Sequence, residues 1–281
     1  MIYISTSCVK NKSVKESIKQ IADYGYTNIE LSGGTDYYPE LVDDLVFLKN
    51  RYKLNLICHN YFPPPKEHFV LNLASLDLST QEKSFKFLKD TIKLSDKLKI
   101  KEFGFHAGFF LNIPLNEIGK KIQSQTLFNK QEAIAQFCKS YIELNNQTKS
   151  KLYIENNVIS RPNYEKFGQN IFMLTSSKDY FALKKLINFD LILDVAHLKV
   201  SCNSLNLNFE EELDILIHET DYIHISDNSG FTDDNIGLKK DSKLYSLLSN
   251  YSLKNKKITL EVYDNSFKEI EKTYNLISDL I

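Results

Sequence analysis

Arginine is nearly absent from this chain of 281 residues: only Arg51 and Arg161 are arginines among its 35 lysines and arginines. The formal net charge is −1 and the sequence pI is about 6.6, so acidic and basic residues balance. A balanced chain has no overall positive field that would attract a phosphate backbone. We therefore expect a small-molecule partner and no nucleic acid.

Paired cysteines and long apolar runs are missing as well. The cysteines are scattered without a CxxC motif, which indicates free thiols and no disulfides. No stretch approaches the roughly 18 apolar residues of a membrane span, and the first residues lack the apolar core of a signal peptide. The sequence therefore predicts a soluble, cytoplasmic protein without a membrane partner. The four cysteines are Cys8, Cys58, Cys138 and Cys202.

Short apolar runs alternate with helical patterns along the whole chain. A short apolar run bounded by polar residues is typical of a strand buried on both faces, as in a parallel sheet. Eight such strands are predicted, at residues 2–6, 28–31, 55–60, 102–106, 152–156, 191–195, 222–226 and 258–262.

The segments between these runs have helical periodicity. Strict alternation of buried strands and helices implies right-handed βαβ units, and eight units favour a closed barrel over an open sheet. The length is close to the roughly 250 residues typical of such a barrel, and no linker divides the chain. We predict the α/β class, as a single-domain (β/α)8 TIM barrel over 1–281. The clearest helical segments are 14–25, 40–52, 84–98, 132–144, 210–219 and 267–281.

Four metal-ligand types stand at the carboxyl ends of consecutive predicted strands. Glu155, Asp194, His224 and Glu261 close the runs KLYIE, LILD, DYIH and KITLE. The carboxyl ends of barrel strands meet at one mouth, where TIM-barrel active sites lie. Crowded carboxylates are costly unless a cation compensates them, so the pattern predicts a divalent metal site. Mixed nitrogen and oxygen ligands favour Mn or Zn, with Co, Mg or Fe as alternatives.

Further ionisable residues extend this candidate site. His59 and His106 end the third and fourth predicted strands, and His197 follows the sixth. Glu30 lies on the second strand, and Arg161 lies in the loop after the fifth, where its guanidinium could clamp a phosphate or carboxylate. We expect these five residues to contact the substrate; Glu30 could instead support a neighbouring site residue, and His197 could instead orient a metal ligand.

These residues, together with VLNLASLD after the third strand and LDVAHLKVS at the sixth, resemble the xylose isomerase-like TIM barrel superfamily. That superfamily includes sugar isomerases and epimerases, inosose dehydratases and the endonuclease IV type of abasic-site nuclease. The resemblance spans nearly the whole chain. Its epimerase branch implies one metal held by Glu155, Asp194, His224 and Glu261, with the two glutamates also serving as catalytic acid and base.

The nuclease branch of the superfamily uses three zinc ions. The resemblance to it implies that His59, His106, His197 and Asp233 are extra metal ligands. That branch also has an Asp-x-His motif after the seventh strand. Asp233 matches its aspartate, but Asn235 stands in place of its histidine. The motif of the third zinc site is therefore incomplete.

We accordingly expect a metal-dependent isomerase or epimerase that acts on a sugar or sugar phosphate. Proton transfer next to a carbonyl needs a base, an acid and a Lewis acid, and Glu155 and Glu261 could flank the reacting carbon. The alternatives are an endonuclease IV-like AP endonuclease or phosphodiesterase, a sugar or inosose dehydratase that starts with the same proton removal, and a binding protein without catalysis. The resemblance also allows a homodimer.

Overall fold

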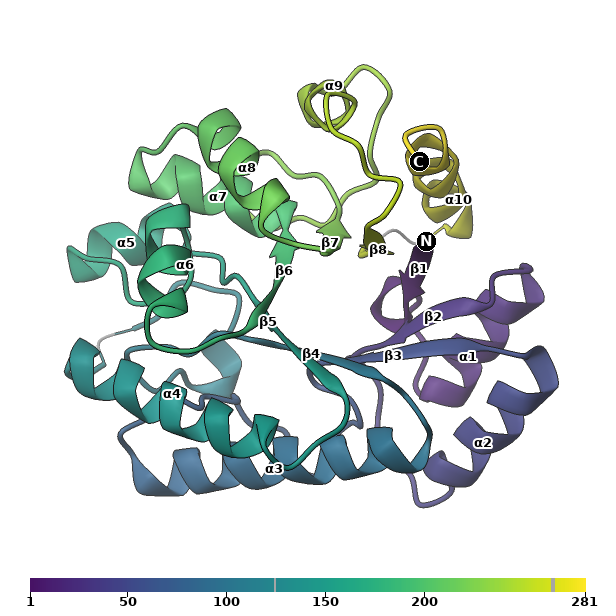
Figure 1. Ribbon diagram of the computed structural model, residues 1–281, viewed down its shortest axis with the longest axis horizontal. Helices are drawn as coiled ribbons and strands as arrows, with labels where there is room; N and C mark the ends of the chain where they lie inside the picture. The colour runs from purple at the N-terminus through teal and green to yellow at the C-terminus, as the bar shows by residue number, and fades with distance from the viewer. Residues whose placement is uncertain (124, 264–265) are drawn as a thin grey trace.

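A computed structural model describes residues 1–123, 125–263 and 266–281 of the chain. Its parallel strands pair in sequence order, and the last strand pairs with the first, so the sheet closes into a barrel (Figure 1). The predicted (β/α)8 fold is thereby confirmed. The strands are β1 (Ile2–Ser5), β2 (Asn28–Leu31), β3 (Asn55–His59), β4 (Glu102–His106), β5 (Lys151–Glu155), β6 (Asp190–Asp194), β7 (Tyr222–Ile225) and β8 (Lys257–Leu260).

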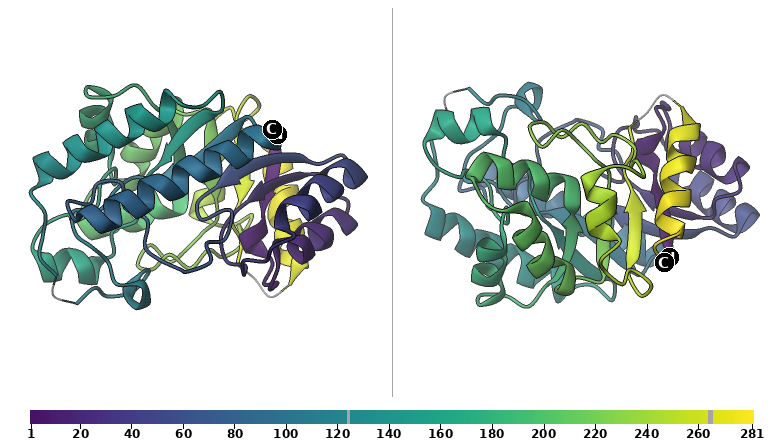
Figure 2. Two further views of the ribbon diagram at one scale, coloured as in Figure 1. Left: turned by 90° about the horizontal axis from the view of Figure 1, so that it is seen from below. Right: turned by 90° about the horizontal axis from the view of Figure 1, so that it is seen from above.

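Helices form the outer layer around this ring of strands, as the two side views show (Figure 2). Of the described helices, none is both long and apolar enough to cross a membrane. The four cysteines are free, as predicted. The helices are α1 (Val14–Asp23), α2 (Leu41–Tyr52), α3 (Leu78–Lys97), α4 (Lys130–Asn145), α5 (Arg161–Phe167), α6 (Ser177–Lys184), α7 (Val195–Leu205), α8 (Phe209–His218), α9 (Lys243–Leu248) and α10 (Phe267–Ser278).

The helical periodicity of the sequence missed α5, α6, α7 and α9. Three of these are short, with 7, 8 and 6 residues, so they offer little more than two turns of pattern. Helix α7 is longer but buried over most of its surface, so apolar residues surround it without a stripe. It also begins at Val195, where the sequence predicted continued strand, because Asp194 caps it.

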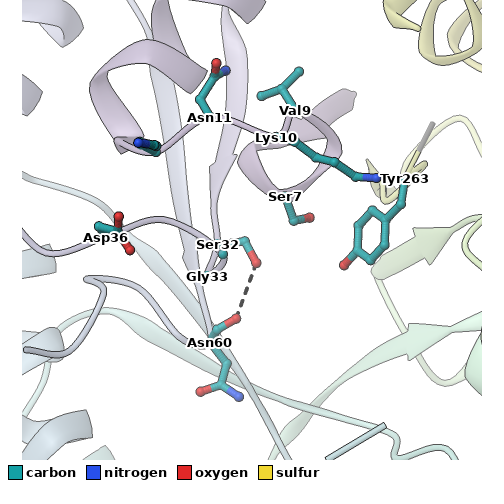
Figure 3. Close-up of a pocket in the computed structure, with 11 residues that line it drawn as sticks. Ser7, Val9, Lys10, Asn11, Ser32, Gly33, Asp36, Asn60 and Tyr263 are labelled. Carbon is teal, nitrogen blue, oxygen red and sulfur yellow. Dashed lines mark hydrogen bonds between the residues drawn. The ribbon is translucent and has the colours of Figure 1, made fainter. Parts of the chain in front are cut away.

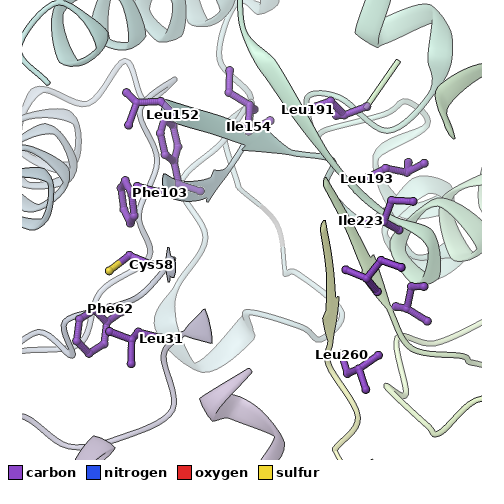
Figure 4. Packing of buried hydrophobic residues seen from close by; sticks show 14 of the residues in the cluster. Leu31, Cys58, Phe62, Phe103, Leu152, Ile154, Leu191, Leu193, Ile223 and Leu260 are labelled. Atoms are coloured by element: carbon purple, nitrogen blue, oxygen red, sulfur yellow. The ribbon is translucent and has the colours of Figure 1, made fainter. Parts of the chain in front are cut away.

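Alternate residues of each strand point to opposite faces of the barrel wall. The outward set, which includes Leu31, Leu152, Ile154 and Leu260, packs toward the surrounding helices (Figure 4). The inward set fills the barrel with a separate buried cluster, which we call the barrel plug: Tyr3, Ile57, Tyr153, Ile192 and Tyr222.

Gly104 of β4 shows how tightly the barrel interior is filled. A Cβ atom on this residue would lie 2.3 Å from Cδ1 of Ile192 and 2.9 Å from Cδ2 of His59. The glycine therefore makes room for one residue of the barrel plug and for one histidine of the mouth above it.

The amino ends of the strands carry a network of opposite charges, which we call the foot of the barrel. Nζ of Lys151 lies 3.1 Å from carboxylate oxygens of both Asp190 and Asp221. Nζ of Lys257 lies 2.9 Å from Glu102 and 3.7 Å from Asp221. Each lysine thus faces two carboxylates at the end of the barrel opposite the predicted site.

Candidate metal centre

The strand ends of the mouth bring the four predicted ligands together. Glu155 and Asp194 end β5 and β6, His224 lies in β7, and Glu261 directly follows β8. The first three have no solvent exposure, and Glu261 is 6% exposed. One donor atom from each of the four residues lies within 4.8 Å of the others. The donor atoms converge because side chains alternate along a strand and each of these four residues belongs to the inward-facing set of its strand.

Glu155 is the centre of the cluster, since its carboxylate faces imidazoles from four directions. Its Oε2 lies 2.7 Å from Nε2 of His59 and 3.0 Å from Nδ1 of His106. Its Oε1 lies 3.3 Å from Nδ1 of His224 and 3.6 Å from Nδ1 of His197. The structure therefore unites every histidine that the sequence assigned to the site.

Asp194 and His197 owe their relative position to the start of helix α7. Asp194 is the N-cap, and its Oδ1 accepts the backbone N–H of His197 at 2.7 Å. Asn156 fixes Asp194 from the other side, because its Oδ1 accepts the Asp194 N–H at 2.7 Å and its Nδ2 donates to the Asp194 carbonyl at 3.0 Å. The second carboxylate oxygen of Asp194 is left to face the cluster.

His197 also reaches toward the loop after β7. Its Nε2 lies 3.2 Å from Oδ2 of Asp233, and its Nδ1 lies 3.0 Å from the carbonyl of Asn156. Asn235, which replaces the histidine of the nuclease motif, donates from Nδ2 to Asp233 at 3.4 Å and accepts the hydroxyl of Ser226 at 2.9 Å. Asn235 therefore holds the carboxylate of Asp233 in place.

Glu30 lies against His224, and one of its donor atoms is within 4.8 Å of donor atoms of His59 and Glu261. Its Oε2 lies 3.0 Å from Nε2 of His224 and accepts hydroxyl hydrogen bonds from Tyr222 and, at 3.2 Å, from Thr259. A carboxylate that holds one ring nitrogen of a histidine orients the other nitrogen toward a metal. Of the two roles that the sequence suggests for Glu30, support of a neighbouring site residue or contact with the substrate, these contacts favour the first. Tyr222 and Thr259, which complete this contact, carried no recognisable signal in the sequence.

Arg161 is not brought to the cluster. Its Nε donates to Glu165 at 2.8 Å, and its Nη1 donates to Oδ1 of Asn206 at 2.9 Å and to carbonyls at the end of α7. The Arg161 guanidinium, at the start of α5, is therefore bound to α5 and to the end of α7.

The electrostatics of the cluster indicate an excess of negative charge. Burial, followed by repulsion from Glu155 and Glu30, raises the pKa of Glu261 to about 7 against the opposing effect of His224. Burial, with Glu155 again contributing, raises the pKa of Asp194 to about 6. Burial also disfavours the ionised form of Glu155, yet the surrounding histidines hold its pKa well below the usual value. The imidazoles thus outweigh the cost of burying the charge of Glu155, but they do not outweigh it for Asp194 and Glu261.

Several buried atoms of the cluster have no hydrogen-bond partner within the described ranges 1–123, 125–263 and 266–281. They include Oε1 of Glu155, Oδ2 of Asp194 and the Nδ1 atoms of His59 and His224. Buried polar atoms of native proteins are nearly always paired, so such a concentration indicates a missing partner. Oxygen and imidazole nitrogen donors that converge on one point fit a divalent cation of the Mn or Zn type.

Two cavities open at the mouth on different sides of the cluster. One, of about 530 Å³, is lined by the loops after β1, β2, β3 and β8, among them Ser7, Ser32, Asn60 and Tyr263 (Figure 3). The other, of about 450 Å³, lies beside β4, β5 and β6 and reaches His106, His197 and Asp233. A small molecule could therefore approach the cluster from the mouth.

Comparison with known proteins agrees with this architecture. A family model described as a xylose isomerase-like TIM barrel matches residues 18–246. No curated protein matches the chain in sequence.

Solved structures similar to this one include both sugar epimerases and a nuclease. A D-tagatose 3-epimerase-like protein has a TM-score of 0.72 at 17% identity, over 99% of this chain and 96% of that one. A D-psicose 3-epimerase from Clostridium cellulolyticum has a TM-score of 0.62 at 12% identity, over 99% and 91%. Endonuclease IV from Thermus thermophilus has a TM-score of 0.62 at 14% identity, over 99% of each chain. At these identities the likeness concerns the fold.

Proposed function

Because the chain belongs to the xylose isomerase-like TIM barrel family, we propose that it is a metal-dependent isomerase or epimerase of a sugar or sugar phosphate. One observation carries this proposal: donor atoms of Glu155, Asp194, His224 and Glu261 converge within 4.8 Å at the ends of four consecutive strands. The similarity in fold to several sugar epimerases supports it.

These four residues would hold the cation. The unpaired oxygens and nitrogens of the cluster, and the raised pKa values of Asp194 and Glu261, are the features that a divalent cation would satisfy. When bound, a divalent cation supplies Lewis-acid polarisation of a substrate carbonyl.

The protein's own part is proton transfer at the carbon next to that carbonyl. Glu155 and Glu261 come from β5 and β8, on different sides of the mouth, so a substrate carbon between them has a carboxylate on each face. One glutamate removes the proton and the other returns a proton to the opposite face, which inverts the carbon. His59, His106 and His197 lie beside this position and would bind the hydroxyl groups of the substrate.

An endonuclease IV-like phosphodiesterase is the second candidate, and a specific observation favours it. His106, Glu155 and His197 form a further potential metal group, and His197 contacts Asp233 at 3.2 Å. Against it stand Asn235 in place of a histidine and the balanced charge of the chain. A dehydratase would share the first proton removal, and it is distinguished by a product that has lost water.

Solvent deuterium exchange tests the proposal. The cation-loaded wild-type protein, incubated with D-tagatose or D-psicose in D₂O, should introduce deuterium next to the carbonyl, and Glu261→Gln should reduce the rate by about 100-fold or more. Glu102→Gln at the foot is the matched control and should exchange at the wild-type rate. Exchange that survives in Glu261→Gln, or cleavage of abasic-site DNA by a protein that binds three cations, would contradict the proposal.

A further inference from the structure

The cavity beside β4, β5 and β6 has apolar walls directly next to the candidate metal centre. Its base reaches His106 and His197, and its walls include Phe109, Ile113 and Phe172. Against such walls, the hydroxyl groups of a sugar would be buried without polar partners, which is costly because buried hydroxyl groups require hydrogen bonds. The walls are therefore suited to an apolar group that continues beyond the atoms at the centre.

These walls belong to a hydrophobic cluster that is separate from the barrel core. It is built mainly from the long loops after β4 and β5, with Val70 from the loop after β3, and it contains Leu111 and Ile122 together with the wall residues. Phe109 and Phe172 join the two loops by an antiparallel bridge, and their rings lie 5.1 Å apart. The mouth thus has an apolar wall that the fold of the barrel itself does not require.

The two buried asparagines that line this cavity are occupied elsewhere. Nδ2 of Asn157 donates to the carbonyls of Ala107, Gly108 and Met173. Asn163 accepts the N–H of Ile122 at 2.8 Å and donates to the carbonyl of Lys120 at 3.0 Å. Their amide groups hold the loops in place, so they add little polar character to the cavity.

Two polar residues at the rim are also paired. Oε2 of Glu117 accepts the N–H of Gln123 at 2.9 Å, and the hydroxyl of Thr232 donates to Asp234 at 2.6 Å. Asp233 lies at the base beside His197, and Lys120 and Ser160 complete the polar part of the lining.

The cavity on the other side of the mouth provides the contrast. Ser7, Ser32, Asn60 and Tyr263 line it with hydroxyl and amide groups, and Oδ1 of Asn60 is buried without a hydrogen-bond partner among the described residues (Figure 3). One cavity of the mouth is thus lined largely by polar residues, whereas the other combines the apolar walls with polar groups at its base and rim.

We propose that the substrate is a hydroxycarbonyl compound that carries an aromatic or branched alkyl substituent, and that this substituent lies between Phe109, Ile113, Ile118 and Phe172. The assignment rests on the proposed function, because the carbonyl end of the substrate must lie on the metal centre. It adds an apolar group to the sugar-like substrates of the proposed function.

A metal-free titration tests the apolar cavity alone. Protein labelled with ¹³C at isoleucine methyl groups is titrated with 3-phenylpropan-1-ol, and with glycerol as the polar counterpart, in the presence of EDTA. Signals of Ile113, Ile118 and Ile122 should shift and saturate with the phenyl alcohol and stay unchanged with glycerol. Ile215, an exposed isoleucine of α8, is the reference for non-specific binding. Equal shifts at Ile215, or none at the three cavity residues, would overturn the proposal.

Calorimetry with Zn²⁺-loaded protein then joins the two parts of the site. The chelator 3-phenylpropanohydroxamate should bind roughly tenfold or more tightly than acetohydroxamate, because only the first buries a phenyl group. Ile118→Ser should reduce this ratio about threefold, whereas Leu115→Ser, in the short helical turn Leu115–Glu117 that precedes Ile118 and outside the cavity, should leave it unchanged. Equal affinities of the two chelators in the wild type would contradict the proposal.

The titration and the calorimetry together distinguish failure of the proposed metal-dependent function from failure of the substrate assignment. If Zn²⁺ and Mn²⁺ fail to bind while the isoleucine signals respond to the phenyl alcohol, the proposed metal-dependent function fails and the apolar binding site stands. If the metal binds and the phenyl group brings no advantage, the substrate assignment fails and the metal-dependent function stands.

Discussion

The two ends of the barrel hold charged residues in opposite ways. At the foot, Lys151 and Lys257 pair with Glu102, Asp190 and Asp221. In the candidate metal centre, within the described part of the chain, the ion-pair partners of Glu30, Glu155 and Glu261 are histidines, which are cationic only when protonated. The neighbouring Asp227 pairs with Lys199. Lysines therefore compensate the carboxylates of the foot, whereas no lysine pairs with the carboxylates Glu30, Glu155 and Glu261 of the candidate centre among the described residues.

This difference indicates that the charges of the foot stabilise the fold, whereas those of the mouth serve a function. The foot residues are partly exposed, so water and lysine together stabilise their carboxylates. The mouth carboxylates are almost fully buried, where an uncompensated charge is costly. Proteins keep such costly buried charges where the charges bind a ligand, which is why carboxylates with perturbed pKa values mark functional sites.

The barrel plug lies between the two ends and contacts both. The hydroxyl of Tyr153 lies toward the foot, where it meets Lys257 and, at 3.4 Å, Asp221. The hydroxyl of Tyr222 points the other way and donates to Glu30. The two rings meet edge to face at 5.3 Å. The plug thus isolates the mouth from the lysines of the foot.

The largest effect that we expect is stabilisation of the mouth by a cation. Zn²⁺ or Mn²⁺ at about 100 times its dissociation constant should stabilise the folded protein by about 2.7 kcal/mol. Glu155→Gln should abolish this gain, because Glu155 is the carboxylate that faces all four imidazoles of the cluster. Urea unfolding with and without the cation measures the difference.

Glu102→Gln is the control for this experiment, since it removes a glutamate charge from the opposite end of the barrel. It should keep the full response to the cation. A response that persists in Glu155→Gln would place the cation elsewhere and break the contrast between mouth and foot.

A smaller effect is expected at Glu30, which contacts His224 from behind. Glu30→Gln should weaken Zn²⁺ binding by about 10- to 100-fold, because the histidine loses the carboxylate that orients its ring. Calorimetry gives the affinity, and ¹⁵N shifts of the His224 ring report the tautomer. Wild-type affinity together with an unchanged tautomer would remove Glu30 from its positioning role.

The sequence predicted the barrel and the gathering of the mouth residues because both follow from one local pattern. A short apolar run that ends in a carboxylate or imidazole specifies a buried strand and places its last inward residue at the mouth. Glu155, Asp194, His59 and His106 occupy the final position of their strands. Glu261 lies one residue beyond its strand and still continues the inward set.

Contacts that cross the barrel could not be predicted in this way. The role of Glu30 depends on Tyr222 and Thr259, which are distant in sequence and carry no motif. The position of Arg161 depends on where α7 ends, and α7 lacks the amphipathic pattern that would have revealed it. Asn156 next to Glu155 was likewise not recognised, although it fixes Asp194.

Loss of a foot lysine should reduce stability without affecting the mouth. Lys257→Met removes contacts to Glu102, Asp221 and Tyr153 from a side chain that is only 18% exposed, so we expect a loss of about 1–2 kcal/mol. Zn²⁺ affinity should not change. Lys243→Met is the matched control, because Lys243 pairs with Glu210 but is 74% exposed, and it should cost almost nothing. A large loss of Zn²⁺ affinity in Lys257→Met would mean that the plug couples the two ends.

The smallest effect concerns the pH dependence of the foot. Burial opposes ionisation of Asp221, but Lys257 and Lys151 outweigh it and hold its pKa below the ordinary value of 3.8. A lowered pKa stabilises the folded state at pH values above 3.8, and this contribution is lost as the pH falls through the folded pKa. Asp221→Asn should thus cost less than about 1 kcal/mol near neutral pH, since the carboxylate is half exposed and screened by water. Urea unfolding at a series of pH values should show the difference from wild type shrinking below pH 3.8; a difference that stayed constant would mean that the amide disturbs packing and that the charge of Asp221 contributes nothing.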